Sequence, residues 1–159
     1  MSASPDIILG LDVGTTAAKA SLFSLDGTIR VTAPLGLGRR LAVVSDLTTH
    51  RVLGARVEHA LAPLARIDSV VLPLHVHADM AAVATVRAAS AGADALIAAG
   101  SGTINDLAKF TAATDGKPFA VFPTAPSMNG YTSANAAITV DGHKKTLPAA
   151  LARGVFIDL

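Results

Sequence analysis

The sequence of 159 residues contains no cysteine and no tryptophan, and only 4% of its residues are aromatic. The absence of cysteine excludes disulfides and thiolate metal sites, and it is compatible with a reducing compartment. Few aromatic side chains and a net charge of +1 provide neither stacking platforms for bases nor a basic face that follows phosphates. We therefore expect no binding to nucleic acid.

Long apolar runs are also missing. No run reaches about 18 residues, and the N-terminal stretch "MSASPD" lacks the basic segment of a signal peptide. We therefore expect a cytoplasmic chain without a membrane partner. With 51% hydrophobic and 16% charged residues, its composition is that of a globular domain with a core.

Residues 40–123 alternate between short apolar runs and segments with helical spacing. The runs "RLAVVSD", "SVVLPL", "ADALIAAG" and "PFAVFPT" predict strands, and the segments between them predict helices. The second and third helices are predicted to end at Gly92 and Gly116. In the first, apolar residues recur at helical spacing: Val52, Leu53, Val57, Ala60, Leu61 and Leu64. Strands that are apolar throughout predict an α/β fold, with a parallel, Rossmann-like sheet covered on both faces.

The two ends of the chain follow other patterns. Beyond Pro123, "SANAAITV" and "HKKTLPA" flank an Asp141-Gly142 turn and predict a hairpin, and "GVFIDL" predicts a last strand. Near the N-terminus, "DIILGLDV", "AKASLFSLDG" and "TIRVTA" predict a β-hairpin or a three-stranded meander. The stretch "APLGLGRR" has turn residues without a helical period, so it predicts a boundary between two units, residues 1–33 and 37–159.

A glycine turn lies where a predicted strand ends and a helix begins. It consists of Gly100, Ser101, Gly102 and Thr103. Free backbone N–H groups and the positive helix end suit a diphosphate there, and the two hydroxyls add donors. The third glycine of the usual dinucleotide fingerprint is missing. A tight turn without a ligand therefore remains the alternative.

Asp46 ends an earlier predicted strand. In nucleotide-binding sheets, an acid at such a position accepts a hydrogen bond from the adenosine ribose. The alternative is an ordinary helix N-cap, a role open to Asp46, Thr48 and Thr49. His75 and His77 lie two residues apart after a predicted strand, but no third metal ligand is evident, so we expect neither to be catalytic.

Three stretches, "GSGTINDLAKF", "FPTAPSMNGYTSANAAITVDGHKKTLPA" and "GVFIDL", resemble sn-glycerol-1-phosphate dehydrogenases. These enzymes belong to the superfamily of iron-containing alcohol dehydrogenases and dehydroquinate synthases. The resemblance runs from about Leu37 to Leu159. It implies an oxidoreductase that binds NAD or NADP, and a metal site, for Zn or Ni, completed by histidines of a C-terminal helical half. That half is not in this sequence, so we expect an incomplete nucleotide-binding fragment.

The resemblance also implies a reaction and roles for individual residues. Hydride passes between the nicotinamide and the carbonyl carbon of dihydroxyacetone phosphate, a small phosphorylated substrate, and the enzyme can be a homo-oligomer. Asp46 would lie at the adenosine ribose and the glycine turn at the diphosphate. Candidate catalytic residues near the nicotinamide and the substrate phosphate are Asp106 and Lys109. The nicotinamide side of the cleft would be lined by Thr124, Ser127 and Tyr131.

Asn129 occupies the position of a metal ligand in this family. The family usually has aspartate there, in "SMDGY", and a neutral amide is a poorer ligand for a divalent cation than a carboxylate. A catalytically inactive NAD-binding pseudoenzyme, or a fusion remnant, is therefore an alternative function.

Residues 6–33 resemble a different family. The stretch "LGLDVGTTAAKASLFSLDG" is similar to the N-terminal hairpin of FGGY carbohydrate kinases. The similarity implies a turn that approaches the ATP phosphates and Mg²⁺, built from Asp12, Gly14, Thr15 and Thr16. A carbohydrate kinase fragment is thus a third hypothesis, and a plain edge hairpin is its alternative.

Overall fold

The computed structural model describes residues 7–13, 18–24, 39–125 and 128–157. Strands β1 (Ile7–Val13) and β2 (Ala18–Ser24) pair antiparallel. The predicted N-terminal β-hairpin is thus present. Its proposed phosphate turn at Gly14, Thr15 and Thr16, and the possible third strand, lie outside the described residues.

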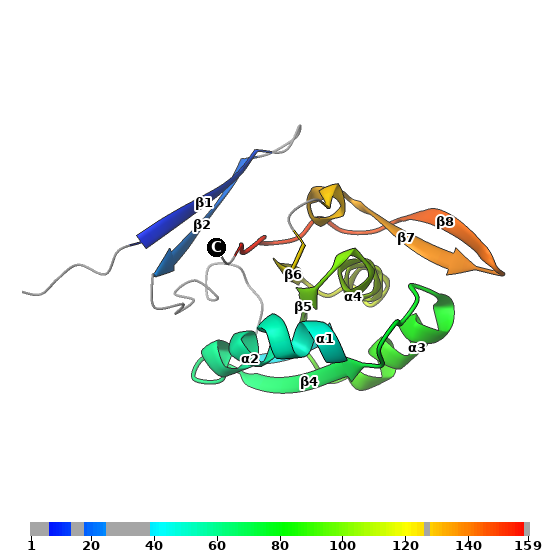
Figure 1. Cartoon of the computed structure of the whole chain (residues 1–159), viewed down its shortest axis with the longest axis horizontal. Helices are drawn as coiled ribbons and strands as arrows, with labels where there is room; N and C mark the ends of the chain where they lie inside the picture. The colour runs from blue at the N-terminus through cyan, green and yellow to red at the C-terminus, as the bar shows by residue number, and fades with distance from the viewer. Residues whose placement is uncertain (1–6, 14–17, 25–38, 126–127, 158–159) are drawn as a thin grey trace, which may run out of the picture.

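The central sheet is parallel and contains β3 (Arg40–Asp46), β4 (Arg66–Leu72), β5 (Ala95–Gly100) and β6 (Phe119–Pro123). Its order is β4-β3-β5-β6, so the chain crosses over β3 between β4 and β5. In Figure 1, α4 lies beside β5. Every residue of the inner strand β5 is buried, whereas the edge strand β4 is partly exposed. The predicted parallel α/β sheet is confirmed.

Helical segments cover both faces of this sheet. On one face, α3 (Met80–Ala89) and α4 (Gly102–Thr114) bury apolar side chains such as Val86 and Leu107 against the strands. On the other, α1 (Leu47–Thr49), the π-helix η2 (His50–Gly54) and α2 (Ala55–Leu61) form one continuous stretch. Its buried large apolar side chains follow a spacing of four and are Leu53, Val57 and Leu61.

Two of the apolar residues at helical spacing in this first helical stretch lie at the surface. Val52 is 60% exposed and Leu64 is 50% exposed. The reason is geometric: only one stripe of a helix can face a sheet, and positions 53, 57 and 61 occupy it. Leu64 also lies beyond the end of α2, in the connection to β4.

The C-terminal part packs on α4 rather than extending the sheet. It contains the 3₁₀-helix η3 (Asn129–Thr132) and an antiparallel hairpin of β7 (Asn135–Val140) and β8 (His143–Pro148). Asp141 and Gly142 have φ of 52° and 76°, as a tight hairpin turn requires. The predicted hairpin is confirmed.

The last predicted strand, "GVFIDL", is not a strand within the residues that the structure describes. Val155 forms an isolated bridge to Val121, and Phe156 donates from its backbone to the Val121 carbonyl. The Phe156 ring stacks on Phe122, with ring centroids 4.7 Å apart. The backbone of residues 153–156 also bonds to the edge of β6, because Arg153 N donates to Phe119 O at 2.6 Å and Val121 N donates to Gly154 O at 3.0 Å, although only one bridge forms. In the described part of the chain, no helix is long and apolar enough to cross a membrane.

Candidate functional site

A pocket of about 200 Å³ opens at the carboxyl ends of β3 and β5. These strands are parallel neighbours, so Asp46 at the end of β3 and Gly100 at the end of β5 reach the same edge of the sheet. The lining residues are Asp46, Thr48, Leu74, His75, Val76, Ser101 and Thr103. The structure thus brings together three predicted cofactor-binding residues from two separate stretches.

The first turn of α4 forms one wall of this pocket and is left uncapped. Ser101 is the N-cap residue, but its side chain makes no capping hydrogen bond. The first backbone bond of the helix runs from Asn105 N to Ser101 O, at 2.9 Å. Among the described residues, the N–H groups of Gly102, Thr103 and Ile104 therefore have no acceptor. Donors of this kind suit an anion.

The two glycines of the turn serve different purposes. A Cβ on residue 100 would lie 2.7 Å from Cβ of Ile104, a fully buried core residue, so Gly100 allows α4 to pack closely on β5. A Cβ on residue 102 would lie 2.0 Å from the terminal methyl of Met128, which is the far end of a flexible side chain. Thr124 joins this region because its N–H donates to Gly100 O at 3.1 Å.

Asp46 caps the helical stretch that follows β3. Its Oδ1 accepts from the N–H groups of Thr48 and Thr49, both at 2.8 Å, and its own N–H donates to Thr49 Oγ1 at 3.0 Å. The N-cap alternative is therefore correct. Its Oδ2 has no partner in the described part of the chain, so a ribose role for Asp46 remains a prediction.

Lys109 is buried in the middle of α4. Its side chain is 0% exposed, and its Nζ donates to the carbonyl oxygens of Gly130, Ser133 (2.9 Å) and Asn135 (3.2 Å). Burial lowers the pKa of Lys109, and the nearby Asp106 charge opposes that shift. Lys109 thus holds η3 and the start of β7 against α4. Its proposed place near the nicotinamide remains a prediction.

Asp106 and Asn105 belong to the same polar layer. Asp106 accepts from Asn105 Nδ2 at 3.0 Å and from the Ala137 N–H at 3.2 Å. Asn105 Nδ2 also approaches Gly130 O, at 3.4 Å. Burial raises the pKa of Asp106, whereas the Ala137 hydrogen bond and the Lys109 charge lower it. Sequence reasoning did not include Asn105 among the site residues. The adjacent polar residues Asn105 and Asp106, within a predicted helix that is otherwise largely apolar, were a usable signal.

Three further candidate site residues, Ser127, Asn129 and Tyr131, follow β6. Tyr131 is 5% exposed, and burial raises the pKa of its phenol. Asn129 is exposed at the start of η3, and Ser127 lies outside the described residues. Within the described ranges, no three His, Asp or Glu side chains gather to hold a metal ion. Among these described residues, Asn129 offers only a neutral amide at the position where the resemblance implies a metal-binding carboxylate.

Sequence reasoning did not place three of the pocket residues at the nucleotide site, and it considered His75 only as a metal ligand. Leu74, His75 and Val76 follow β4 and face the pocket from its other side. His75 has a φ of 58°, a left-handed conformation that is uncommon for residues other than glycine. Periodicity and motif spacing carry no signal for such a backbone, because no glycine or asparagine marks it.

Comparisons with known proteins agree with this fold. The family model described as iron-containing alcohol dehydrogenase matches residues 22–159. Glycerol-1-phosphate dehydrogenase [NAD(P)+] of Bacillus licheniformis is 37% identical over 126 residues, which are 76% of this chain and 31% of that protein. The protein of the same name from Bacillus subtilis is 32% identical over 127 residues, 76% of this chain and 32% of that protein.

Solved structures show the same fold. Maleylacetate reductase from Rhizobium sp. strain MTP-10005 has a TM-score of 0.62 and 27% identity, over 79% of this chain and 35% of that one. ValA, a 2-epi-5-epi-valiolone synthase from Streptomyces hygroscopicus with NAD+ and Zn2+ bound, has a TM-score of 0.66 at 20% identity. It is covered over 39% of its chain, against 81% of this one.

The fold and the family match define the class: the chain belongs to the iron-containing alcohol dehydrogenase family. It spans about a third of the length of the curated relatives it matches. The resemblance of residues 6–33 to carbohydrate kinases receives no support from these comparisons.

Proposed function

We propose that this chain is the nucleotide-binding part of an NAD(P)-dependent oxidoreductase of the glycerol-1-phosphate dehydrogenase type. The observation that carries this proposal is the uncapped first turn of α4, whose free N–H groups lie beside a pocket that also contains Asp46. The identity to dehydrogenases named for glycerol 1-phosphate and NAD(P)+ supports the same function.

The residues at the pocket suit a dinucleotide. The N–H groups of Gly102 and Thr103, with the hydroxyls of Ser101 and Thr103, would donate to the diphosphate. Asp46 Oδ2 would accept from a ribose hydroxyl while Oδ1 keeps its two capping bonds. The same helix cap therefore presents one carboxylate oxygen to the backbone and the other to the ligand.

When bound, the nicotinamide supplies the acceptor or donor of hydride for a small phosphorylated substrate such as dihydroxyacetone phosphate. Thr124, Ser127 and Tyr131 are proposed to line that end of the cleft, with Asp106 and Lys109 beneath it. In this chain, Asp106 and Lys109 bond to the backbone of residues 130–137, which include Tyr131 of the proposed nicotinamide side. A cytoplasmic location and a homo-oligomeric state are part of the same proposal.

A second candidate is a protein that binds NAD(H) without dehydrogenase activity. The observation that favours it is Asn129, a neutral amide where the resemblance places a metal-binding carboxylate. Such a protein would keep the diphosphate and ribose contacts. The two candidates therefore share the nucleotide site and differ in turnover.

Calorimetric titration with NADH tests the shared site. Gly102→Val should weaken NADH binding by about tenfold to a hundredfold, because the branched side chain removes access to charge-assisted donors. Gly130→Ala is the matched control, since its added Cβ meets only ordinary contacts at 3.6 Å and 3.8 Å. Equal NADH affinity in the wild-type and Gly102→Val chains would overturn the proposed site.

A further inference from the structure

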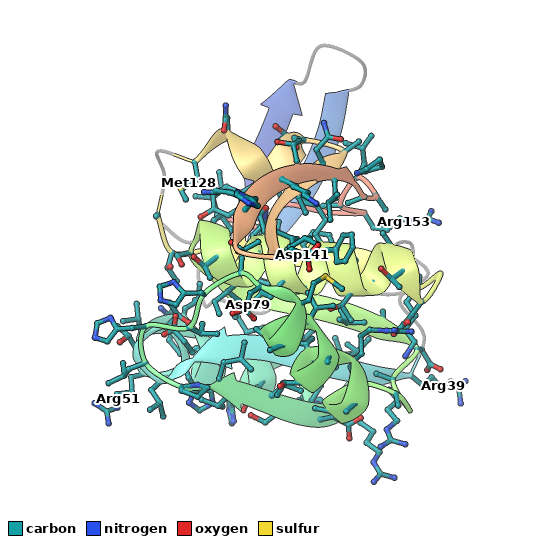
Figure 2. All side chains as sticks on the ribbon, turned by 90° about the vertical axis from the view of Figure 1, so that its right-hand side faces the viewer. Arg39, Arg51, Asp79, Met128, Asp141 and Arg153 are labelled. Carbon is teal, nitrogen blue, oxygen red and sulfur yellow. The ribbon has the colours of Figure 1, made fainter. Side chains whose placement is uncertain are left out.

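Met128 covers the first turn of α4. Its terminal methyl lies 2.0 Å from the point that a Cβ on Gly102 would occupy, and its sulfur lies 3.5 Å from that point. The methyl is therefore in van der Waals contact with the backbone of the first residue of the helix. Figure 2 shows Met128 beside one end of α4.

A thioether is a poor partner for the groups that it covers. The N–H groups at this turn lack acceptors among the residues described, and a methionine sulfur is only a weak acceptor. The methyl group offers no acceptor at all. The contact thus shields the backbone of Gly102 without satisfying the donors around it.

The backbone near Met128 is held, but its side chain is not. Two residues further on, Gly130 O accepts hydrogen bonds from Lys109 Nζ and Asn105 Nδ2. The Met128 side chain is 42% exposed and has three rotatable bonds. Rotation of the side chain alone can therefore clear the turn while η3 stays in place.

We propose that Met128 is a displaceable cover of the dinucleotide site. The Met128 methyl occupies the space beside the Gly102 backbone that a bound diphosphate would need. The side chain therefore rotates away when the diphosphate binds. This inference rests on the proposed function. It assigns to Met128 control of affinity for the diphosphate.

Selective labelling makes the movement visible, because the sequence contains only three methionines. With ¹³C-methyl methionine, the Met128 signal should shift on titration with NADH or ADP and stay unchanged with adenosine, which lacks a diphosphate. Met80 is 45% exposed at the start of α3 and serves as the internal control, with no expected shift.

Truncation tests the energetic role. Met128→Ala should raise the affinity for NADH by about twofold to tenfold, the amount expected when one side chain no longer has to be displaced and reordered. Met80→Ala is the matched control and should leave NADH affinity unchanged. Gly102→Ala should shift the Met128 methyl signal without any ligand, since the new Cβ expels it.

The outcomes separate this inference from the proposed function. If NADH binds and Gly102→Val weakens that binding as expected, but the Met128 signal does not move and Met128→Ala does not raise affinity, only the cover is refuted. If Met128→Ala weakens binding, Met128 is a direct contact and the cover is also refuted. If NADH does not bind to the wild-type chain, the proposed function and the cover fall together.

Discussion

The first turn of helix α4 leaves its N–H groups without acceptors among the described residues. In the middle of the same helix, by contrast, Lys109 Nζ donates to the carbonyl oxygens of Gly130, Ser133 and Asn135. Both regions contain residues that the sequence analysis named as candidate site residues. The difference is that the first turn retains hydrogen-bonding capacity for a ligand, whereas the Lys109 ammonium has used its three donors inside the fold. Binding is therefore expected at the turn, and stability at the middle.

The largest effect should come from breaking the satisfied region. Lys109→Met should lower the free energy of unfolding by about 3 kcal/mol, because it leaves buried carbonyl groups without their donor. Urea denaturation measures the change. Lys117→Met is the matched control: Lys117 donates to Ser90 O and Ala91 O from a more exposed position, so about 1 kcal/mol is expected. Equal losses for the two variants would contradict the comparison.

The two glycines of the turn sharpen the same contrast. Gly100→Ala should destabilise the chain by about 1–3 kcal/mol, because its Cβ would collide with the buried Ile104. Gly102→Ala should have a smaller effect, since the group it meets is the flexible end of Met128. Thermal and urea unfolding measure the two losses of stability. A larger loss for Gly102→Ala than for Gly100→Ala would contradict the assignment of the rigid contact to Gly100.

Asp46 combines a satisfied and a free hydrogen-bonding group. Its Oδ1 caps a helix, and its Oδ2 has no partner among the described residues. Asp46→Ala should cost about 1 kcal/mol of stability, as the loss of an N-cap usually does. Asp46→Asn keeps a capping oxygen and should cost less. Without the carboxylate charge, Asp46→Asn should also reduce any preference for NADH over NADPH. Calorimetric titration with both nucleotides checks this, and an unchanged preference would remove Asp46 from the ribose.

The smallest effect is a pH dependence at Asp106. Burial raises the pKa of Asp106 above its ordinary value of 3.8, so the folded chain holds this proton more tightly than the unfolded chain does. Its contribution to the free energy of unfolding therefore falls as pH rises from below 3.8 through the raised folded-state pKa. Asp106→Asn removes that slope, which urea denaturation over this range measures. A wild-type curve identical in slope to that of Asp106→Asn would show no such shift.

Local sequence patterns predicted most of the elements of the fold. Apolar runs located β3, β4, β5 and β6, because strands buried on both faces leave a continuous signal. The Asp141-Gly142 turn was predictable because few residue pairs accept two positive φ angles. At residues 154–157, the predicted strand is reduced to one isolated bridge with β6, since an apolar run does not show how far its pairing with a strand edge extends.

The candidate site was only half predictable. The glycine turn and Asp46 were found because strand ends are visible in the sequence, and parallel strands bring their carboxyl ends together. The direction of a side chain on a helix was not visible. Lys109 turns toward the carbonyls of residues 130–135 only because the C-terminal hairpin packs there, and His75 enters the pocket through a backbone angle that its residue type does not announce.

The Lys109 contacts also have a consequence for folding kinetics. The β7–β8 hairpin closes through a two-residue turn, so it can form early from local contacts. The lysine reaches carbonyls 21 to 26 residues away and must lose its water first, so we expect these bonds to form after the transition state. Lys109→Met should then speed unfolding while leaving the folding rate nearly unchanged. The lifetime of the folded η3 segment, rather than the speed at which it forms, is thus what the buried ammonium controls.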